Sequence, residues 1–180
     1  APGLSGIVGG RPTVYPVIRL FSFLIDKCAC ALQVEINGQC IPVDLPEVAA
    51  FDPAQVAAET PLPTVQETPQ SSVPLVKLAV ARSGDKGNHS NIGVMARKPE
   101  YLAWIAAALT PEAVAEWMQH VLDGQNSKVS RWHLPASHSL NFLLENALGG
   151  GGVASLRIDP QGKAFAQQLL EFPVPVPQGL

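Results

Sequence analysis

Apolar and polar residues follow patterns that divide this chain into parts with different expected structures. Residues 17–25, VIRLFSFLI, are dense in large apolar side chains, which is typical of a buried strand. Between residues 46 and 74 this density falls, and prolines lie among Glu, Gln, Thr and Ser. Because proline favours extended backbone, residues 46–74 are predicted to be a semi-rigid linker. Regular apolar spacing returns at Leu75 and continues to Phe172, after which residues 173–180 are predicted to be an extended tail.

Residues 28–43 are predicted to form a β-hairpin, because Asn37 and Gly38 are the pair preferred in a type I′ turn. A two-residue turn fixes the register, which pairs Ile36 with Gln39, Glu35 with Cys40 and Val34 with Ile41. One strand and one hairpin cannot cover each other's apolar faces. Residues 1–45 are therefore predicted to be the C-terminal end of a larger N-terminal domain. That missing domain, or another chain, would cover them.

Residues 75–172 are predicted to form one domain in which strands and helices alternate. Strands are expected at residues 75–82, 92–97, 128–134 and 153–158. Helices are expected at 99–109, from Thr110 to the cap at Gly124, from Ser137 or Ser139 to Leu148, and after Pro160 with Phe165, Leu169 and Phe172 inward. This order predicts an α+β sandwich with one small, mainly antiparallel sheet and helices on one face.

The polar stretch between the first two predicted strands, residues 83–91, is the first candidate site. Gly84 and Gly87 allow backbone N–H groups to turn towards a ligand, and Arg82 and Lys86 add positive charge. With the carboxamides of Asn88 and Asn91, such a loop could cradle a phosphate, carboxylate or thioester oxygen. The alternative is a chain reversal whose polar side chains bond only their own backbone.

The predicted third helix and the glycines after it form the second candidate site. His138, Asn141 and Glu145 would lie on one polar edge of that helix. In the run Gly149–Gly152, Gly150 and Gly151 could expose N–H groups to an anion. An ordinary helix end with a solvated face explains the same pattern. If both candidate sites line one pocket, as we predict, Asp85 and Glu145 could act as a catalytic carboxylate pair.

Charge and motifs exclude several classes of function. A net charge of −3 and the absence of basic runs argue against nucleic-acid binding. No apolar run approaches the roughly 20 residues that span a bilayer, and the first residues lack the pattern of a signal peptide, so a cytoplasmic protein without membrane contact is expected. The four histidines lack metal-site spacing, and no metal is expected.

The three cysteines, Cys28, Cys30 and Cys40, are predicted to be buried free thiols. In the predicted hairpin, Cys28 and Cys30 share one face and Cys40 points to the other. A disulfide needs neighbouring Cβ atoms, which this register denies to Cys40. Reduced thiols also fit a cytoplasmic location.

Three stretches resemble the acyclic terpene utilisation proteins, often called AtuA. They are GGRPTVYPVIRLFSFLIDK at residues 9–27, ARSGDKGNHSNIGVMAR at 81–97 and LNFLLENALGGGGVASLRIDPQGK at 140–163. The resemblance implies a ferredoxin-like C-terminal module, preceded by the end of a longer N-terminal domain. His89 stands where the family often has Thr, so the resemblance gives this imidazole no essential role.

This family occurs beside acyl-CoA enzymes that degrade geraniol and citronellol. The resemblance therefore implies the C-terminal part of an enzyme, or enzyme subunit, that acts on branched isoprenoid acyl-CoA intermediates. The alternative is a non-catalytic assembly or ligand-binding module of a larger complex. We expect a small-molecule ligand such as an acyl-CoA and a homo-oligomer, whereas neither the resemblance nor the residues identify a cofactor.

Overall fold

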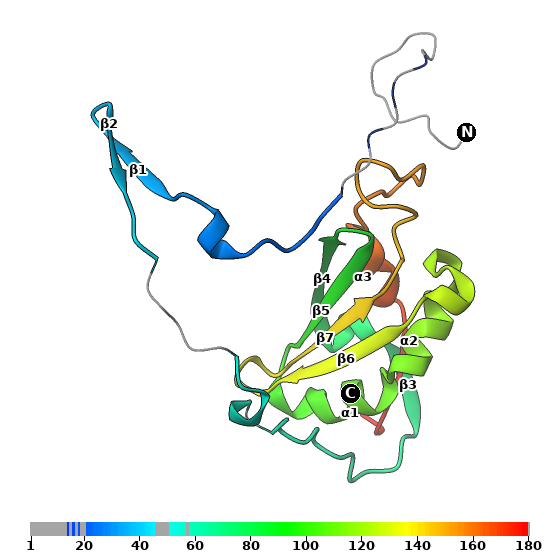
Figure 1. Cartoon of the computed structure of the whole chain (residues 1–180). Coiled ribbons are helices and arrows are strands. Elements are labelled where there is room, and N and C mark those ends of the chain that lie inside the picture. The colour runs from blue at the N-terminus through cyan, green and yellow to red at the C-terminus, as the bar shows by residue number, and fades with distance from the viewer. Residues whose placement is uncertain are drawn as a thin grey trace. The chain divides into compact units, whose positions relative to one another are not determined.

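The computed structural model describes residues 21–45, 51–56 and 58–179, together with Val14, Pro16 and Ile18 (Figure 1). The chain divides into two compact units: residues 21–58, and a unit that contains residues 59–180. No helix among the described residues is long and apolar enough to cross a membrane.

The smaller unit is built around the predicted hairpin. Its elements are the 3₁₀ turn η1 (Lys27–Ala29), strands β1 (Gln33–Ile36) and β2 (Gln39–Pro42), and the 3₁₀ turn η2 (Pro53–Gln55). The register pairs Ile36 with Gln39, Glu35 with Cys40 and Val34 with Ile41, which confirms the prediction. Asn37 and Gly38 both have positive φ, at 52° and 77°, as a type I′ turn requires.

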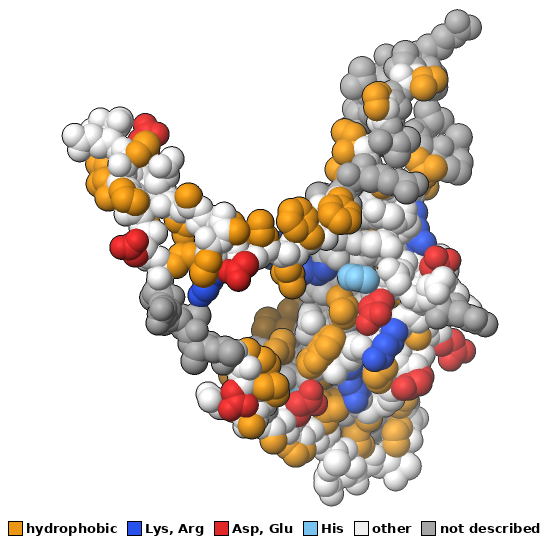
Figure 2. All heavy atoms as spheres, in the orientation of Figure 1, with side chains coloured by type: hydrophobic (Ala, Val, Ile, Leu, Met, Phe, Trp, Pro, Cys, Tyr) orange, Lys and Arg blue, Asp and Glu red, His pale blue; other side chains and the backbone are white. Residues whose placement is uncertain are grey.

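The predicted strand over residues 17–25 is wrong wherever the structure describes it. Ile18 and residues 21–25 have no regular secondary structure, and residues 17, 19 and 20 lie outside the described part. Large apolar side chains are exposed along this segment and along the hairpin: Phe21, Phe23, Leu24, Ile25, Leu32, Val34, Ile36, Ile41 and Val43 (Figure 2). The described residues of this unit therefore do not bury these apolar side chains.

The cysteines of this unit are free but exposed, so the predicted burial is wrong. The cause is local. The carboxylate of Asp26 accepts a hydrogen bond from the Cys28 N–H at 2.9 Å and starts η1. The first strand therefore begins only at Gln33, and Cys28 and Cys30 never join the face of the hairpin.

Iodoacetamide is expected to modify all three cysteines of the folded, unreduced chain, because each thiol is exposed. Intact-mass spectrometry would count the added groups. The same chain alkylated after unfolding is the control and should gain the same mass. A folded chain that retains unmodified cysteines, or a mass that shows a disulfide, would contradict this exposure.

The larger unit contains a four-stranded sheet of order β4-β5-β7-β6. The strands are β4 (Ala79–Lys86), β5 (His89–Ala96), β6 (Val129–Leu134) and β7 (Ser139–Leu144). Every neighbouring pair is antiparallel. Together with the helices, this arrangement confirms the predicted α+β class.

The helices and turns of this unit are short. They are η3 (Leu75–Lys77), η4 (Pro99–Tyr101), α1 (Leu102–Ala108), α2 (Pro111–Trp117), η5 (Gln119–Val121), η6 (Gly124–Asn126), η7 (Pro135–Ser137) and α3 (Phe165–Leu169). Thr110 caps α2 as predicted, because its Oγ1 accepts a hydrogen bond from the Ala113 N–H at 3.1 Å. The helix ends at Trp117, earlier than the predicted Gly124.

Side-chain alternation gives the sheet one covered and one open face. Ile92 and Val94 of β5 are buried, as are Leu140, Phe142 and Leu144 of β7. On this side α1 contacts β5, α2 contacts β6, and α3 contacts β4 and β5. The residues between them point to the opposite side, where Met95 and Trp132 are exposed. The polar residues of the first candidate site, 83–91, belong to strands β4 and β5 of this sheet and to the turn between them.

Two predicted elements are wrong: the third helix and the strand after it. Residues 137–148 do not form a helix, since β7 occupies 139–144 and His138 has a left-handed φ of 49°. The buried residues alternate with period two, and only the pairing of β7 with β5 and β6 separates this pattern from a helical one. The predicted strand 153–158 is not formed, since these residues pair with no described strand and Val153 and Ile158 are exposed.

The larger unit also extends beyond the predicted limits of 75 and 172. Strand β3 (Ser71–Pro74), from the predicted linker, pairs with β8 (Pro173–Val176), from the predicted tail. We call this two-stranded sheet the clasp. Val174 and Val176 are fully buried, whereas Pro173 and Pro175 alternate with them on the exposed side. In the predicted linker, the Asp52 side chain caps η2, whose first residue is Pro53.

Candidate functional site

The predicted polar loop, residues 83–91, consists mostly of strand. Strands β4 and β5 run through it and are joined by the two-residue turn Gly87–Asn88, with Lys86 paired to His89. The φ of Gly87 is 65°, as expected at the first central position of a type II′ turn. Lys86 and Gly87 are exposed at the tip of this hairpin, whereas Ser83, Gly84 and Ser90 are buried.

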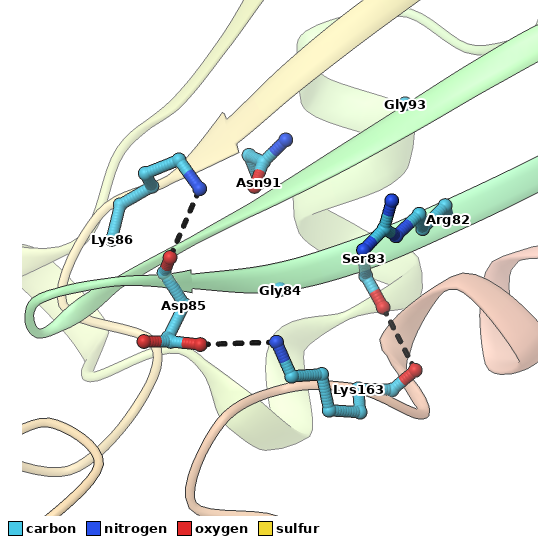
Figure 3. A pocket seen from close by; sticks show the side chains of 8 residues that line it. All are labelled: Arg82, Ser83, Gly84, Asp85, Lys86, Asn91, Gly93 and Lys163. Atoms are coloured by element: carbon cyan, nitrogen blue, oxygen red, sulfur yellow. Dashed lines mark hydrogen bonds and ion pairs between the residues drawn. The ribbon is translucent and has the colours of Figure 1, made fainter.

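A hollow of about 480 Å³ lies against this end of β4. Its lining residues come from β4, β5 and the loop before α3, and we call it the β4 hollow (Figure 3). They are Arg82, Ser83, Gly84, Asp85, Lys86, Asn91, Gly93 and Lys163. Three of these residues are cationic and one is a carboxylate, so the β4 hollow carries a net positive charge and favours an anionic ligand.

Asp85 and Lys163 form an ion pair across the edge of β4. The Lys163 Nζ lies 3.1 Å from Oδ1 of Asp85, and both side chains are partly exposed. The hydrogen bond from Lys163 is the main cause that lowers the pKa of Asp85 below its ordinary value. Asp85 is therefore a weak proton acceptor, and the contact that the structure gives it is with Lys163.

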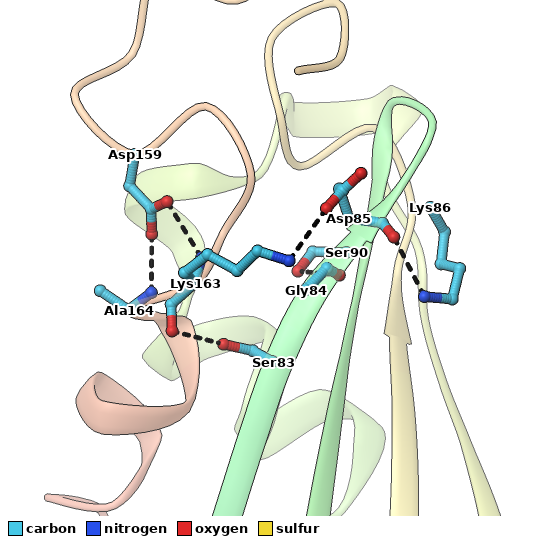
Figure 4. A network of polar contacts seen from close by, with 8 residues as sticks. All are labelled: Ser83, Gly84, Asp85, Lys86, Ser90, Asp159, Lys163 and Ala164. Atoms are coloured by element: carbon cyan, nitrogen blue, oxygen red, sulfur yellow. Dashed lines mark hydrogen bonds and ion pairs between the residues drawn. The ribbon is translucent and has the colours of Figure 1, made fainter.

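The backbone of Lys163 is held by two side chains from different elements (Figure 4). The Asp159 carboxylate accepts hydrogen bonds from the N–H groups of Lys163, at 3.0 Å, and Ala164, at 2.8 Å. The Ser83 hydroxyl donates to the Lys163 carbonyl at 3.1 Å and accepts from the Ala166 N–H at 2.9 Å. These bonds join the start of α3 to β4 and direct the Lys163 side chain towards the β4 hollow.

Gly84 leaves room for the Lys163 ammonium group. A Cβ built on Gly84 would lie 3.1 Å from Nζ of Lys163. The carbonyl of Gly84 is also tied down, because it accepts a hydrogen bond from the buried Ser90 hydroxyl at 3.1 Å. The missing side chain at position 84 is therefore explained by the close approach of Lys163.

The other two cations of the β4 hollow are available to a ligand. Arg82 is exposed, and its guanidinium makes no hydrogen bond or ion pair with any described residue. Lys86 is also exposed, and its ammonium group donates to the neighbouring Asp85 carbonyl at 3.0 Å. Because neither group has a carboxylate partner in the described part of the chain, both can bind an anion without breaking an ion pair described here.

The turn Gly87–Asn88 and the glycine run, which were predicted to line one pocket, lie against each other. The Gly150 N–H donates to Oδ1 of Asn88 at 2.7 Å, and a Cβ built on Gly151 would lie 3.1 Å from the Gly87 carbonyl oxygen. Asn88 also donates to Oδ1 of Asn146 at 3.1 Å. These four predicted ligand-binding residues pack against one another beside the β4 hollow, and none of them lines it.

The remaining predicted site residues separate. Asn141, on β7, borders the β4 hollow, because its Oδ1 accepts a hydrogen bond from Asn91 Nδ2 at 3.2 Å. Glu145 follows β7 and does not line the hollow that Asp85 lines. The Nδ1 atom of His89 accepts a hydrogen bond from the Asn146 N–H at 2.9 Å, a contact that fixes the end of β7 beside β5.

Sequence reasoning missed Lys163, Gly93 and Ser83. Lys163 lies 78 residues after Asp85, so no local pattern connects the two. The turn Asp159–Gly162 directly before Lys163 marks it as the residue that enters α3, yet this signal does not show which strand it faces. Among the residues that the structure describes, no group of three or more His, Cys, Asp or Glu side chains could hold a metal ion.

The comparison with protein families identifies the domain that carries this hollow. Residues 73–175, more than half of the chain, match the model of the AtuA ferredoxin-like domain. The chain belongs to the AtuA ferredoxin-like domain family.

The matched part of this AtuA ferredoxin-like domain begins in β3 and ends in β8, and it contains every residue that lines the β4 hollow. The match confirms the family resemblance of the sequence and the ferredoxin-like module that it implied. Comparison with curated proteins gave no match, and comparison with solved structures gave none either.

Proposed function

We propose that this chain is part of an enzyme, or enzyme subunit, that acts on branched isoprenoid acyl-CoA intermediates in the catabolism of acyclic terpenes such as citronellol and geraniol. In this proposal the β4 hollow binds an anionic part of the acyl-CoA. Family membership supports the pathway, and the chemistry of the lining residues supports the class of ligand.

The observation that carries the proposal is that two cations without a carboxylate partner among the described residues flank a glycine. Arg82 and Lys86 project from alternate positions of one strand, and Gly84 lies between them. An arginine can bind a phosphate through two parallel hydrogen bonds, and a lysine adds a point charge. A phosphate of the CoA part fits this arrangement, with the thioester oxygen as a second, weaker acceptor.

Replacing Lys86 with alanine is expected to weaken the binding of CoA by about 1–3 kcal/mol, the usual range for a lost hydrogen bond to a charged group. Isothermal titration calorimetry on the whole chain would measure the affinity. Lys98→Ala is the matched control, because it removes the same charge from a residue outside the β4 hollow that lies over the Tyr101 ring. Equal losses in the two variants would show that only net charge matters, and no binding to the unchanged protein would contradict the proposal.

The alternative, a non-catalytic ligand-binding module, is favoured by the contact of Asp85 with Lys163, since a carboxylate with a lowered pKa is poorly suited to accept a proton. Incubation of the chain with branched acyl-CoA esters, followed by mass spectrometry, separates the two. Bound but chemically unchanged ester would support the module. Conversion that is lost in Asp85→Asn would support an enzyme.

A further inference from the structure

The fold gives no reason for a glycine at position 93, in the middle of β5. Gly93 is not among the glycines with positive φ. A Cβ built on it would meet nothing closer than the Arg82 carbonyl oxygen at 3.9 Å, an ordinary contact. Glycine weakens the interior of a strand and often marks a place where a ligand approaches the backbone closely. No described residue therefore fills the space above the backbone of Gly93, and a ligand could occupy it.

The neighbours of Gly93 define what that space would accept. Arg82 is its partner in β4 and Asn141 is its partner in β7, so bare backbone separates a guanidinium from a carboxamide. Asn91 donates one hydrogen bond to Asn141. That bond leaves the oxygen of Asn91 and the amino group of Asn141 without a described partner. The pair thus offers one acceptor, on Asn91, and one donor, on Asn141.

We infer that the β4 hollow contains a second subsite, in which a planar group of the ligand lies on the backbone of Gly93 with its hydrogen-bonding edge at Asn91 and Asn141. The inference rests on the proposed function, since the anionic group of the same ligand binds at Arg82 and Lys86. The planar group must present a donor beside an acceptor, as an amide or a nucleobase edge does. A volume of about 480 Å³ accommodates an anionic group and such a planar group together.

Gly93→Val tests this subsite without disturbing the fold. Valine suits a strand better than glycine, and its branched side chain would occupy the space above the backbone. Urea denaturation is therefore expected to show unchanged or higher stability. The affinity for CoA should fall by about tenfold or more, as for other additions of bulk to a binding pocket. Gly93→Ala adds only the Cβ, for which the structure has room, and should give a smaller loss.

Four smaller probes, each titrated against the unchanged chain and Gly93→Val, assign the loss to the planar group. Inorganic phosphate and pyrophosphate carry only the anion, 4′-phosphopantetheine adds amides to one phosphate, and ADP adds a nucleobase to two. Phosphate and pyrophosphate should each bind both proteins equally. The unchanged chain should bind 4′-phosphopantetheine more tightly than phosphate, or ADP more tightly than pyrophosphate, and Gly93→Val and Asn141→Ala should abolish that advantage. The probe that shows the advantage identifies the planar group as amide or nucleobase.

The outcomes separate this inference from the proposed function. If the unchanged chain binds CoA and Gly93→Val binds it equally well, the subsite is overturned and the cationic site stands. If valine also weakens pyrophosphate binding by the same factor, the space above Gly93 belongs to the anion and the subsite is again overturned. If the unchanged chain binds neither CoA nor pyrophosphate, both the proposed function and the subsite are overturned.

Discussion

Replacing Phe142 with alanine is expected to lower the free energy of unfolding of the ferredoxin-like domain by about 3–5 kcal/mol. Phe142 is fully buried on the inner strand β7, where it lies between Ile92 of β5 and Arg131 of β6. A cavity left there would be enclosed by strands on both sides and could not collapse easily. Urea denaturation followed by tryptophan fluorescence would measure the loss, because all three tryptophans of the chain, Trp104, Trp117 and Trp132, lie in this domain.

Leu143→Ala is the matched control for this prediction. Leu143 lies on the same strand but faces the opposite side of the sheet, where it is only partly buried. Its loss should therefore cost clearly less than that of Phe142. A helix over these residues would place Leu143 in the buried stripe and Phe142 outside it. A larger loss for Leu143 than for Phe142 would thus contradict strand β7 itself.

Replacing Gly162 with alanine is expected to lower the free energy of unfolding by about 2–5 kcal/mol. Part of this cost is the left-handed backbone, at a φ of 62°, which costs a residue with a Cβ about 1–2 kcal/mol. The rest is overpacking, which typically costs about 1–3 kcal/mol. A Cβ at this position would lie 2.7 Å from the Ser90 hydroxyl oxygen and 3.2 Å from carbons of both Leu148 and Phe165. The same urea denaturation would measure it.

Gly124→Ala separates the two causes. Gly124 has a φ of 51°, and a Cβ built on it would meet nothing within 4 Å. The control should therefore show only the backbone cost of about 1–2 kcal/mol. Since Gly162 precedes Lys163, its variant should also weaken CoA binding, whereas Gly124→Ala should not. Equal effects of the two variants on stability would mean that the close packing around Gly162 relaxes without cost.

Features set by neighbouring residues could be predicted from the sequence. Asn37 and Gly38 determine the turn of the β1–β2 hairpin, and that turn alone fixes the register. The cap at Thr110 depends on a hydroxyl and an N–H three residues apart. The mainly antiparallel sheet could also be predicted, because β4, β5 and β6 overlap strands that their own apolar residues indicate.

Features set by distant residues could not be predicted. Leu140 and Leu144 fit both a helix and a strand, since four residues is one helical turn and also two repeats of a strand. The structure resolves this ambiguity by placing β7 between β5 and β6, and no residue within β7 signals that pairing. The same applies to the clasp, whose two strands are separated by the whole domain and whose prolines indicate a linker when each is considered alone.

The candidate site likewise has a part that neighbouring residues determine and a part that distant residues determine. Arg82, Gly84, Lys86 and Asn91 lie close together in the sequence and line one hollow, as a local polar stretch suggested. Lys163 reaches this hollow only because Asp159 and Ser83 fix the backbone before α3. Glu145 was grouped with Asp85 on the assumption of a helix, and once the residues before it form a strand, that grouping loses its geometric basis.

The clasp determines how the domain would respond to a pull on its two ends. The chain enters β3 at Ser71 and leaves β8 at Val176, and these two residues are paired. A stretching force therefore acts on this outermost pair first and opens the ladder one pair at a time, as a zipper opens, instead of shearing all pairs at once. The clasp would open at low force while the four-stranded sheet, which lies outside this line of load, keeps its hydrogen bonds. Under load, the clasp would therefore yield before the strands that line the β4 hollow.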